Sequence, residues 1–358
     1  MKTIAHARTA VSILALFAAA HCGSPNESSP PPAQPTSPPA LPPSMGGAAS
    51  GQTPGGQGGA EVPSPAADKS GPEVDRAISS IKAGDYRSAK GALELALQKN
   101  PKDGKAAYYM GVTLENLGDK KGAEQHYKDA VTYAPDIAEA AINLGALYLD
   151  QSKWDEAIAV TQKALAKRGE DPGLHANMAV ALRGKGDKPG AAAEYERVMK
   201  VVGDNPELRF AYGDLLLEMG NKQKAASELK AGLASAGSNR ALLASIGRLL
   251  GAAGAYADCV AALDKAIAGG DDHELRVRRG VCRHSLADET GAKADFQAAV
   301  KLNPKYAPAH YYLGESFRAL GDLPQAAKEF DAAHALDPQG ALGKKAKEQA
   351  DAARKGRK

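Results

Sequence analysis

The strongest constraint on this chain is an internal repeat of 34 residues that runs from residue 70 to residue 340. Glycine, a Gly-Asp pair and alanine return in the same order, and eight blocks follow one another in register. The blocks begin at Ser70, Gly104, Ala138, Pro172, Pro206, Arg240, His273 and Ala307, and the sixth is shorter by one residue. A repeat of this length indicates one supersecondary unit that is stacked many times.

Two positions of the repeat carry small side chains, and a third carries a bulky one. Small residues are expected where two helices cross closely, and a bulky residue fills the space beside the crossing. Position 8 holds Ala77, Gly111, Gly145, Ala179, Gly213, Gly247, Gly280 and Gly314, and position 20 holds Ala89, Ala123, Ala157, Ala191, Ala225, Cys259, Ala292 and Ala326. Position 24 holds Leu93, Tyr127, Tyr195, Leu229, Leu263, Phe296 and Phe330, with Thr161 as the exception. The pattern predicts two helices per repeat, helix A and helix B, that cross at positions 8 and 20.

Recurring residues of the repeat also predict where the helices end. Helix A is expected to end at Gly84-Asp85, Gly118-Asp119, Gly186-Asp187 and Gly321-Asp322. Glycine can take the left-handed conformation that closes a helix, and the polar residue begins the turn. Proline at position 32 of four blocks (Pro101, Pro135, Pro304 and Pro338) stops helix B.

In these residues the chain resembles the tetratricopeptide-repeat (TPR) family over about three quarters of its length. The resemblance implies an all-α fold, a right-handed α-solenoid of about eight helix-turn-helix repeats with helix A lining a concave groove. The repeats cover residues 70–103, 104–137, 138–171, 172–205, 206–239, 240–272, 273–306 and 307–340. Residues 341–358 are predicted to form a capping helix and a basic tail, because a solenoid must cover its last apolar face.

In TPR proteins the groove is lined mainly by positions 2, 5, 9 and 12 of helix A. These positions hold Tyr108, Glu115, Ile142, Leu149, Arg183, Phe210, Asp214, Leu217, Arg248, Val281, His284, Tyr311, Glu315 and Arg318. Tyr108, Phe210 and Tyr311 are the strongest candidates, because aromatic side chains dominate protein-binding hot spots. At position 5, packing between repeats is an equal alternative. No block has the Lys at position 5 and Asn at position 9 of chaperone-tail-binding members, so an amphipathic helix or an extended segment is the expected ligand.

Residues 1–22 are predicted to be an export signal with a lipidation site at Cys22. A basic start precedes an apolar stretch over residues 10–20, which is too short to span a bilayer. The residues around Cys22 resemble a bacterial lipobox, in which the cysteine is diacylated and becomes the mature N-terminus. His21 departs from the small residue of that motif, so ordinary signal-peptidase cleavage after Ala20 stays open as the alternative.

Residues 23–69 are rich in Pro, Gly and Ser and are predicted to be a disordered linker, because they lack the apolar bulk to offset chain entropy. Such a linker suits a domain tethered to a membrane, which favours lipidation of Cys22. Gly23 is not Asp, and in lipoprotein sorting this implies the outer membrane. The expected location is therefore the cell envelope, as an outer-membrane lipoprotein that faces the periplasm and touches the membrane only through its lipid.

The charge of the chain argues against nucleic acid as a partner. The net charge is +3, of which residues 1–21 contribute +2 and residues 341–358 contribute +5, so residues 22–340 carry −4. A mildly acidic body lacks the clustered basic residues that phosphate contacts need. Four arginines on one helix, Arg276, Arg278, Arg279 and Arg283, suit either an acidic partner segment or neutralisation by neighbouring carboxylates.

Cys259 and Cys282 are expected to lie near each other, since they fall on helices that pack antiparallel. In an oxidising compartment a disulfide between them would close a loop of about 24 residues and contribute about 3 kcal/mol. The alternative is two small buried apolar residues.

The sequence offers no convergent set of reactive groups. The eight histidines are scattered, His273-Glu274 lacks the second histidine of a zinc protease, and no CxxC pair is present. We therefore expect no enzyme activity, no metal and no cofactor.

The leading hypothesis is a non-catalytic scaffold or adaptor of the bacterial cell envelope that binds helical or extended segments of other proteins in its groove. The alternatives are a regulatory subunit of an envelope enzyme, and an assembly factor of a pilus, secretin or motility complex. A TPR array in front of a glycosyltransferase domain would leave residues for that domain, and none remain.

Overall fold

The computed structural model describes residues 71–356, and within them it contains 17 helices and no strand. The helices A of the eight repeats are α2 (Pro72–Lys82), α4 (Gly104–Asn116), α6 (Ala138–Asp150), α8 (Pro172–Lys185), α10 (Pro206–Glu218), α12 (Arg240–Ala253), α14 (His273–Ser285) and α16 (Ala307–Ala319). The helices B are α3 (Tyr86–Lys99), α5 (Lys120–Tyr133), α7 (Trp154–Leu165), α9 (Lys188–Val202), α11 (Lys222–Ser235), α13 (Tyr256–Ala268), α15 (Glu289–Leu302) and α17 (Leu323–Leu336). The last helix is α18 (Ala341–Lys355).

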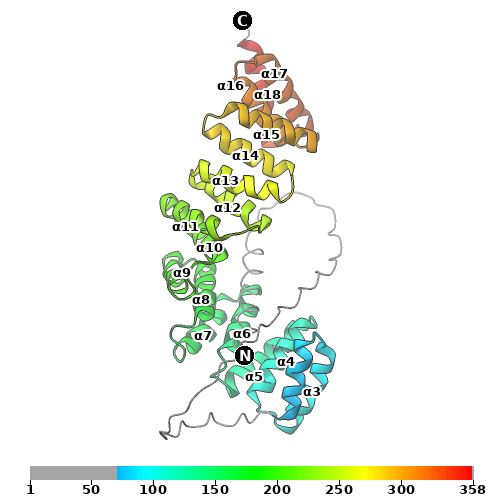
Figure 1. The fold of residues 1–358 in the computed structure, drawn as a ribbon, viewed down its shortest axis with the longest axis vertical. Coiled ribbons are helices and arrows are strands. Elements are labelled where there is room, and N and C mark those ends of the chain that lie inside the picture. The colour runs from blue at the N-terminus through cyan, green and yellow to red at the C-terminus, as the bar shows by residue number, and fades with distance from the viewer. Residues whose placement is uncertain (1–70, 357–358) are drawn as a thin grey trace, which may run out of the picture.

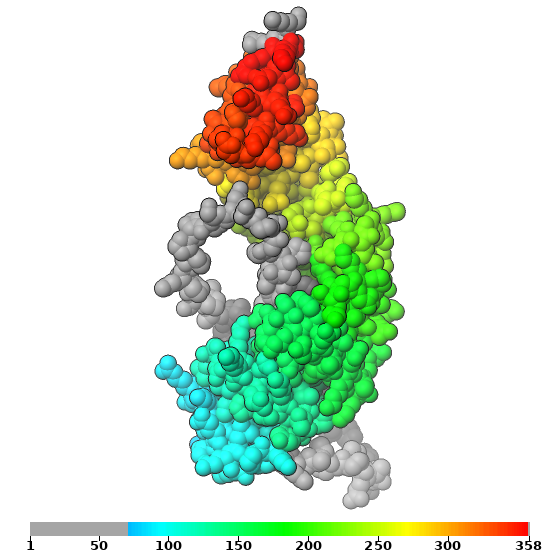
Figure 2. Space-filling view, turned by 180° about the vertical axis from the view of Figure 1, so that it is seen from behind, coloured from blue at the N-terminus to red at the C-terminus, as the bar shows by residue number. Residues whose placement is uncertain are grey.

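The helices form two layers in a curved stack. Each helix B packs on the helix A of its own repeat and on the helix A of the next. In Figure 1 α7, α9 and α11 lie on the outer side of the curve, and α6, α8 and α10 lie on the inner side. Figure 2 shows that the first and last repeats bend toward the same side, so the inner layer lines a concave face. The prediction of an all-α repeat solenoid is confirmed.

Close contact between helices A and B of one repeat explains the glycine at position 8. A Cβ atom added at Gly111 would lie 2.5 Å from the ring of Tyr127, and one added at Gly280 would lie 2.5 Å from the ring of Phe296. Both rings are at position 24 of the same repeat, so position 8 is small because position 24 occupies the space above it. The predicted helix crossing is confirmed.

In repeat 3 a different side chain packs against the glycine at position 8. Its position 24 is Thr161, which is too short to cover Gly145 alone. The side chain of Asn177, from helix α8 of the next repeat, fills the remaining space and donates a hydrogen bond of 2.7 Å to the carbonyl of Ile142. Asn177 is 1 % exposed, so repeats 3 and 4 share a buried polar contact.

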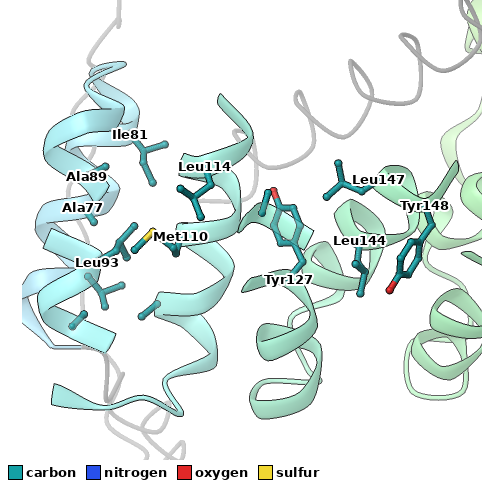
Figure 3. Close-up of a cluster of buried hydrophobic side chains, with 14 of the residues drawn as sticks. Ala77, Ile81, Ala89, Leu93, Met110, Leu114, Tyr127, Leu144, Leu147 and Tyr148 are labelled. Atoms are coloured by element: carbon teal, nitrogen blue, oxygen red, sulfur yellow. The ribbon is translucent and has the colours of Figure 1, made fainter. Parts of the chain in front are cut away.

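The core runs continuously along the stack and does not form one central cluster. Figure 3 shows Met110, Leu114, Tyr127 and Leu144 between the helices of the first three repeats. Similar clusters join each later repeat to its neighbour. Because each repeat buries its apolar face only against adjacent repeats, stability is the sum of local terms.

Position 15 of the repeat ends helix A in a left-handed conformation. Gly84, Gly118, Gly186 and Gly321 have φ between 79° and 88°. The aspartate that follows each of them accepts a hydrogen bond from a backbone N–H in the first turn of helix B. The predicted turn is confirmed, and the aspartate is the N-cap of helix B.

Two repeats place a residue with a side chain at this position. Ser152 has φ 56° and Ala287 has φ 60°. A left-handed conformation costs an L-residue about 1–2 kcal/mol, which glycine avoids. We therefore expect Ala287→Gly to stabilise the protein by about 1 kcal/mol, measured as a shift of the urea midpoint. Gly254→Ala, at the same position in repeat 6, should destabilise the protein by a similar amount. Shifts of the urea midpoint in the same direction for the two changes would contradict this account.

Helix α18 closes the C-terminal end of the stack. It packs on α17 and α16, and Ala346 and Ala350 are fully buried in that contact. The ammonium of Lys345 lies 5.4 Å from the centre of the Tyr311 ring, so α18 covers part of the inner surface of repeat 8.

Candidate functional site

The concave face carries a row of half-buried apolar side chains that the core does not enclose. Tyr108, Phe210, Leu217 and Val281 are half-buried and belong to three helices A of the inner layer, α4, α10 and α14. The ring of Tyr108 also meets that of Tyr109 edge-on, with 5.0 Å between their centroids. These are the apolar members of the predicted groove that stay partly exposed.

Four of the predicted groove residues are buried, and their assignment to the ligand surface is wrong. Ile142, Leu149, Asp214 and Tyr311 are only 2–5 % exposed. Ile142 packs against Leu174 of the next repeat, and Tyr311 packs against Phe330 and α18. At position 5 the adjacent helix A closes over the side chain, so the packing alternative is correct for Ile142 and Tyr311.

Asp214 is buried, and an ion pair with another predicted groove residue compensates its charge. A guanidinium nitrogen of Arg183 lies 2.6 Å from a carboxylate oxygen of Asp214 and also contacts Glu218. Burial alone would lower the pKa of Arg183, but the hydrogen bonds to Glu218 and Asp214 outweigh it and raise that pKa. The three side chains join repeats 4 and 5, so Arg183 is already neutralised within the protein.

Other charged groove residues also have partners within the chain. The hydroxyl of Tyr127 donates a hydrogen bond of 2.8 Å to Glu115, and Arg318 pairs with Glu315 at 2.5 Å. His284 is exposed, with its Nδ1 atom 2.7 Å from a carboxylate oxygen of Glu289.

Arg248 is exposed, and among residues 71–356 no carboxylate lies within 4.0 Å of it.

Position 6 of helix A is also partly exposed in repeats 2 and 3, and the predicted set of positions 2, 5, 9 and 12 left it out. Tyr109 is half-buried at this position, and Asn143 at the same position of repeat 3 donates a hydrogen bond of 3.2 Å to the hydroxyl of Tyr127. The helical period already places position 6 beside positions 2 and 9, so this signal was available in the sequence.

Three of the four arginines of repeat 7, Arg276, Arg279 and Arg283, are neutralised internally. Asp295 is 1 % exposed, and it accepts hydrogen bonds from Arg276 at 3.1 Å, from Arg279 at 2.9 Å and from Arg283 at 2.9 Å. The hydrogen bond to Asp295 is the main cause that raises the pKa of Arg279. Of the two alternatives for these arginines, the structure therefore supports neutralisation by neighbouring carboxylates.

Repeat 7 is one case of a pairing that recurs in four of the eight repeats. A cationic or imidazole side chain at position 4 of helix A contacts a carboxylate at position 23 of helix B in repeats 4, 5, 7 and 8. The pairs are His175–Glu194, Arg209–Glu228, Arg276–Asp295 and His310–Glu329. This pairing was not predicted, although complementary residues at a spacing of 19 could have indicated it.

The imidazole of His310 has an acceptor at each nitrogen. Its Nδ1 atom lies 2.7 Å from a carboxylate oxygen of Glu329, and its Nε2 atom lies 3.0 Å from the carbonyl oxygen of Pro304. Only the protonated ring can donate to both, and the hydrogen bond to Glu329 is the main cause that raises the pKa of His310.

This geometry predicts a pH dependence of stability. Unfolded histidine has a pKa of about 6.5, so the contribution of His310 is fully present below that pH. It is lost as the pH rises through the higher pKa of the folded state. We expect the difference in unfolding free energy between the wild type and His310→Gln to shrink from about pH 5.5 to about pH 9, as measured by urea unfolding. A difference that does not change with pH would contradict a protonated imidazole.

Cys259 and Cys282 form a disulfide between α13 and α14, with 6.4 Å between their Cα atoms. Both residues are buried, at 1 % and 4 % exposure. A Cβ atom at Gly251 would approach both sulfur atoms, at 3.3 and 3.5 Å, so glycine makes room for the bond. The disulfide links repeat 6 covalently to repeat 7.

Within residues 71–356 no three His, Cys, Asp or Glu side chains gather as metal ligands would. The helices of those residues are all too short or too polar to cross a membrane. Cys22, the export signal and the linker lie outside the described residues.

Stacked helix pairs with a curved inner surface define the class of this protein, an all-α repeat solenoid. Two family models, both described as tetratricopeptide repeat, match it over residues 78–235 and 288–341. The chain belongs to the tetratricopeptide-repeat family, and such solenoids use their extended concave surfaces for binding. No curated protein sequence matches the chain.

Several solved structures share the fold. PilW, described as a widely conserved type IV pilus biogenesis factor, is 20 % identical, with a TM-score of 0.50 over 55 % of this chain and 91 % of PilW. A thermophilic TPR protein of Thermus thermophilus is 22 % identical, with a TM-score of 0.41 over 50 % of this chain and 97 % of its own. YrrB, described as a TPR protein with an unusual peptide-binding site, is 21 % identical, with a TM-score of 0.45 over 52 % of this chain and 97 % of YrrB.

Proposed function

We propose that the protein is a non-catalytic scaffold that holds a segment of a partner protein along its concave face. The observation that carries this proposal is the row of half-buried apolar side chains at Tyr108, Phe210, Leu217 and Val281. A surface with no ligand would gain solubility from charged residues at these positions. Aromatic and aliphatic side chains that are partly packed by their own helix supply binding area at a small cost in conformational entropy.

We further propose that this scaffold works in the bacterial cell envelope, as an outer-membrane lipoprotein facing the periplasm. The export signal, the cysteine at position 22 and the long Pro/Gly/Ser-rich linker support this location. The Cys259–Cys282 disulfide also supports it, because disulfides persist in oxidising compartments.

One alternative is an assembly factor of a pilus, secretin or motility complex. The structural similarity to PilW favours this role, although at 20 % identity it rests on the fold. A regulatory subunit of an envelope enzyme uses the same groove for a different client, and it predicts an enzyme that co-purifies in a fixed ratio.

The scaffold role is tested by pull-down from envelope extracts with the full chain. Phe210→Ala and Tyr108→Ala should each reduce recovery of a specific partner at least tenfold, which corresponds to about 1.4 kcal/mol or more. Leu95→Ala is the matched control, because Leu95 is 49 % exposed on helix α3 of the outer layer. Partner binding that survives both groove variants would refute the concave site.

The location is tested by mass spectrometry of the mature N-terminus. A diacylated or triacylated Cys22 is the expected result. A mature chain that begins with unmodified His21 would instead show cleavage after Ala20 and would remove the lipid anchor from the proposal.

A further inference from the structure

Arg248 differs from the other arginines at positions 9 and 12 of the inner layer. Arg183 is bound by Asp214 and Glu218, and Arg318 is bound by Glu315. Arg248 is exposed, and within the described residues it has no carboxylate at ion-pair distance. It is therefore a charge of the inner layer that the carboxylates of residues 71–356 leave uncompensated.

The side chains around Arg248 are small on its own helix and apolar on the neighbouring helix. Helix α12, which carries it, presents only the small residues Ala241, Ala244 and Ser245 along the preceding turns. Helix α10 packs against α12 on one side and contributes half-buried Phe210 and Leu217 to the edge of the repeat 6 core. Arg248 thus follows two turns of small exposed or half-buried side chains, on a helix that packs beside the half-buried Phe210 and Leu217 of α10.

The next helix, α14, adds a second cation on the other side. Arg278 is exposed, and its one ion pair in the described part of the chain is a 4.0 Å contact with Glu274 on the same helix. Such an exposed pair contributes at most about 1 kcal/mol, so a better-placed carboxylate can replace it. Val281 of α14 is half-buried. We call the surface formed by Phe210, Leu217, Ala244, Arg248, Arg278 and Val281 the repeat 5–7 trough.

We propose that the repeat 5–7 trough binds an acidic amphipathic segment of a partner protein. Apolar side chains of the segment pack on Phe210, Leu217 and Val281, and its carboxylates pair with Arg248 and Arg278. Guanidinium binds carboxylate through two parallel hydrogen bonds, and the apolar wall excludes water from them. The apolar wall favours a peptide over a nucleic acid, whose phosphates would use only the cations. This inference rests on the proposed scaffold function.

The test is a selection from a random library of peptides of about 12 residues on the immobilised full chain. Wild-type protein should enrich peptides in which Asp or Glu lies beside Leu, Ile or Phe. Arg248→Glu should weaken the selected peptides at least tenfold, and a new selection on that variant should enrich Lys and Arg instead. Arg87→Glu makes the same charge change on exposed helix α3 of the outer layer, and it should alter the affinity less than twofold.

The folding of Arg248→Glu is checked by circular dichroism and thermal melting. Both should match the wild type, because no carboxylate of the folded repeats that the structure describes is at ion-pair distance from Arg248. Selected peptides without acidic enrichment, an effect of Arg248→Glu below twofold, or no selected peptide at all would overturn the inference. Tighter binding of a single-stranded oligonucleotide than of the peptides would overturn it in favour of nucleic acid. If Phe210→Ala still weakens the selected peptides while Arg248→Glu does not, the scaffold function stands and only the acidic partner falls.

Discussion

Replacing Asp295 with alanine is expected to destabilise the C-terminal repeats by about 3–5 kcal/mol, the largest effect predicted for one carboxylate in this protein. Asp295 is 1 % exposed and accepts hydrogen bonds from Arg276, Arg279 and Arg283. Its removal leaves Arg279, whose side chain is 10 % exposed, with only the surface residue Asp264 as a partner. A buried guanidinium that loses its main counter-charge keeps the cost of desolvation and loses the compensating attraction.

The loss should be local, because each repeat of a solenoid is held only by its neighbours. Hydrogen exchange should therefore rise in α14 and α15 and remain unchanged in α4 and α5. Trp154, the one tryptophan of the chain, lies in repeat 3, so its fluorescence reports on the other half of the stack. Circular dichroism in urea measures the whole array.

Two control variants separate charge from volume at this site. Asp264→Asn removes a carboxylate that is 49 % exposed and should cost less than about 1 kcal/mol. The double variant Asp295→Leu, Arg279→Met replaces the pair by apolar side chains and should recover much of the stability lost in Asp295→Ala. If the double variant is as unstable as Asp295→Ala, the unpaired charge of Arg279 is not the cause of the loss.

Gly280→Val is expected to destabilise repeat 7 by about 3 kcal/mol through overpacking. The Cβ atom alone would lie 2.5 Å from the ring of Phe296, which is 1 % exposed and cannot move aside without displacing its neighbours. Valine is otherwise a better helix former than glycine, so a loss of stability must come from the collision. The urea unfolding midpoint and the melting temperature should both fall.

The matched control is Gly91→Val on helix α3, where an added Cβ atom meets nothing within 4 Å. It should leave stability unchanged or raise it slightly. Repeat 1 suggests a rescue, because it combines Ala77 at position 8 with the smaller Leu93 at position 24. Phe296→Leu should therefore restore part of the stability of Gly280→Val. Equal losses at Gly91 and Gly280 would show that the collision with Phe296 is not the cause of the loss.

The sequence predicted the repeat, the helix pairs and the turns, because these depend on local properties that recur. The same helix contact returns in each repeat and requires a small residue at position 8 and a bulky one at position 24. The same turn also returns and favours glycine at position 15. The sequence also shows where the pattern is broken, since Thr161 replaces the bulky residue at position 24. That Asn177 of the next repeat fills the gap depends on how two repeats stack, and the pattern of one repeat does not contain this information.

The ligand surface was less predictable than the fold. Tyr108 and Tyr311 share position 5 and the same side chain, yet Tyr108 is half-buried and Tyr311 is 4 % exposed because α18 covers it. Position 6 was missed, and the ion pairs between positions 4 and 23 were not expected. Exposure at these sites is a property of the neighbouring repeat, which the position number does not specify.

The sequence by itself determined that this chain stacks paired helices and leaves one face of helix A open, because short-range periodicity dictates both. Only the tertiary structure decided which charges remain available on that face. Arg183 and the arginines near Asp295 are neutralised by carboxylates from other helices, whereas none of the carboxylates in the described helices neutralises Arg248. Ion pairing depends on distances of a few ångströms between residues far apart in the chain, and those distances exist only after the repeats have packed.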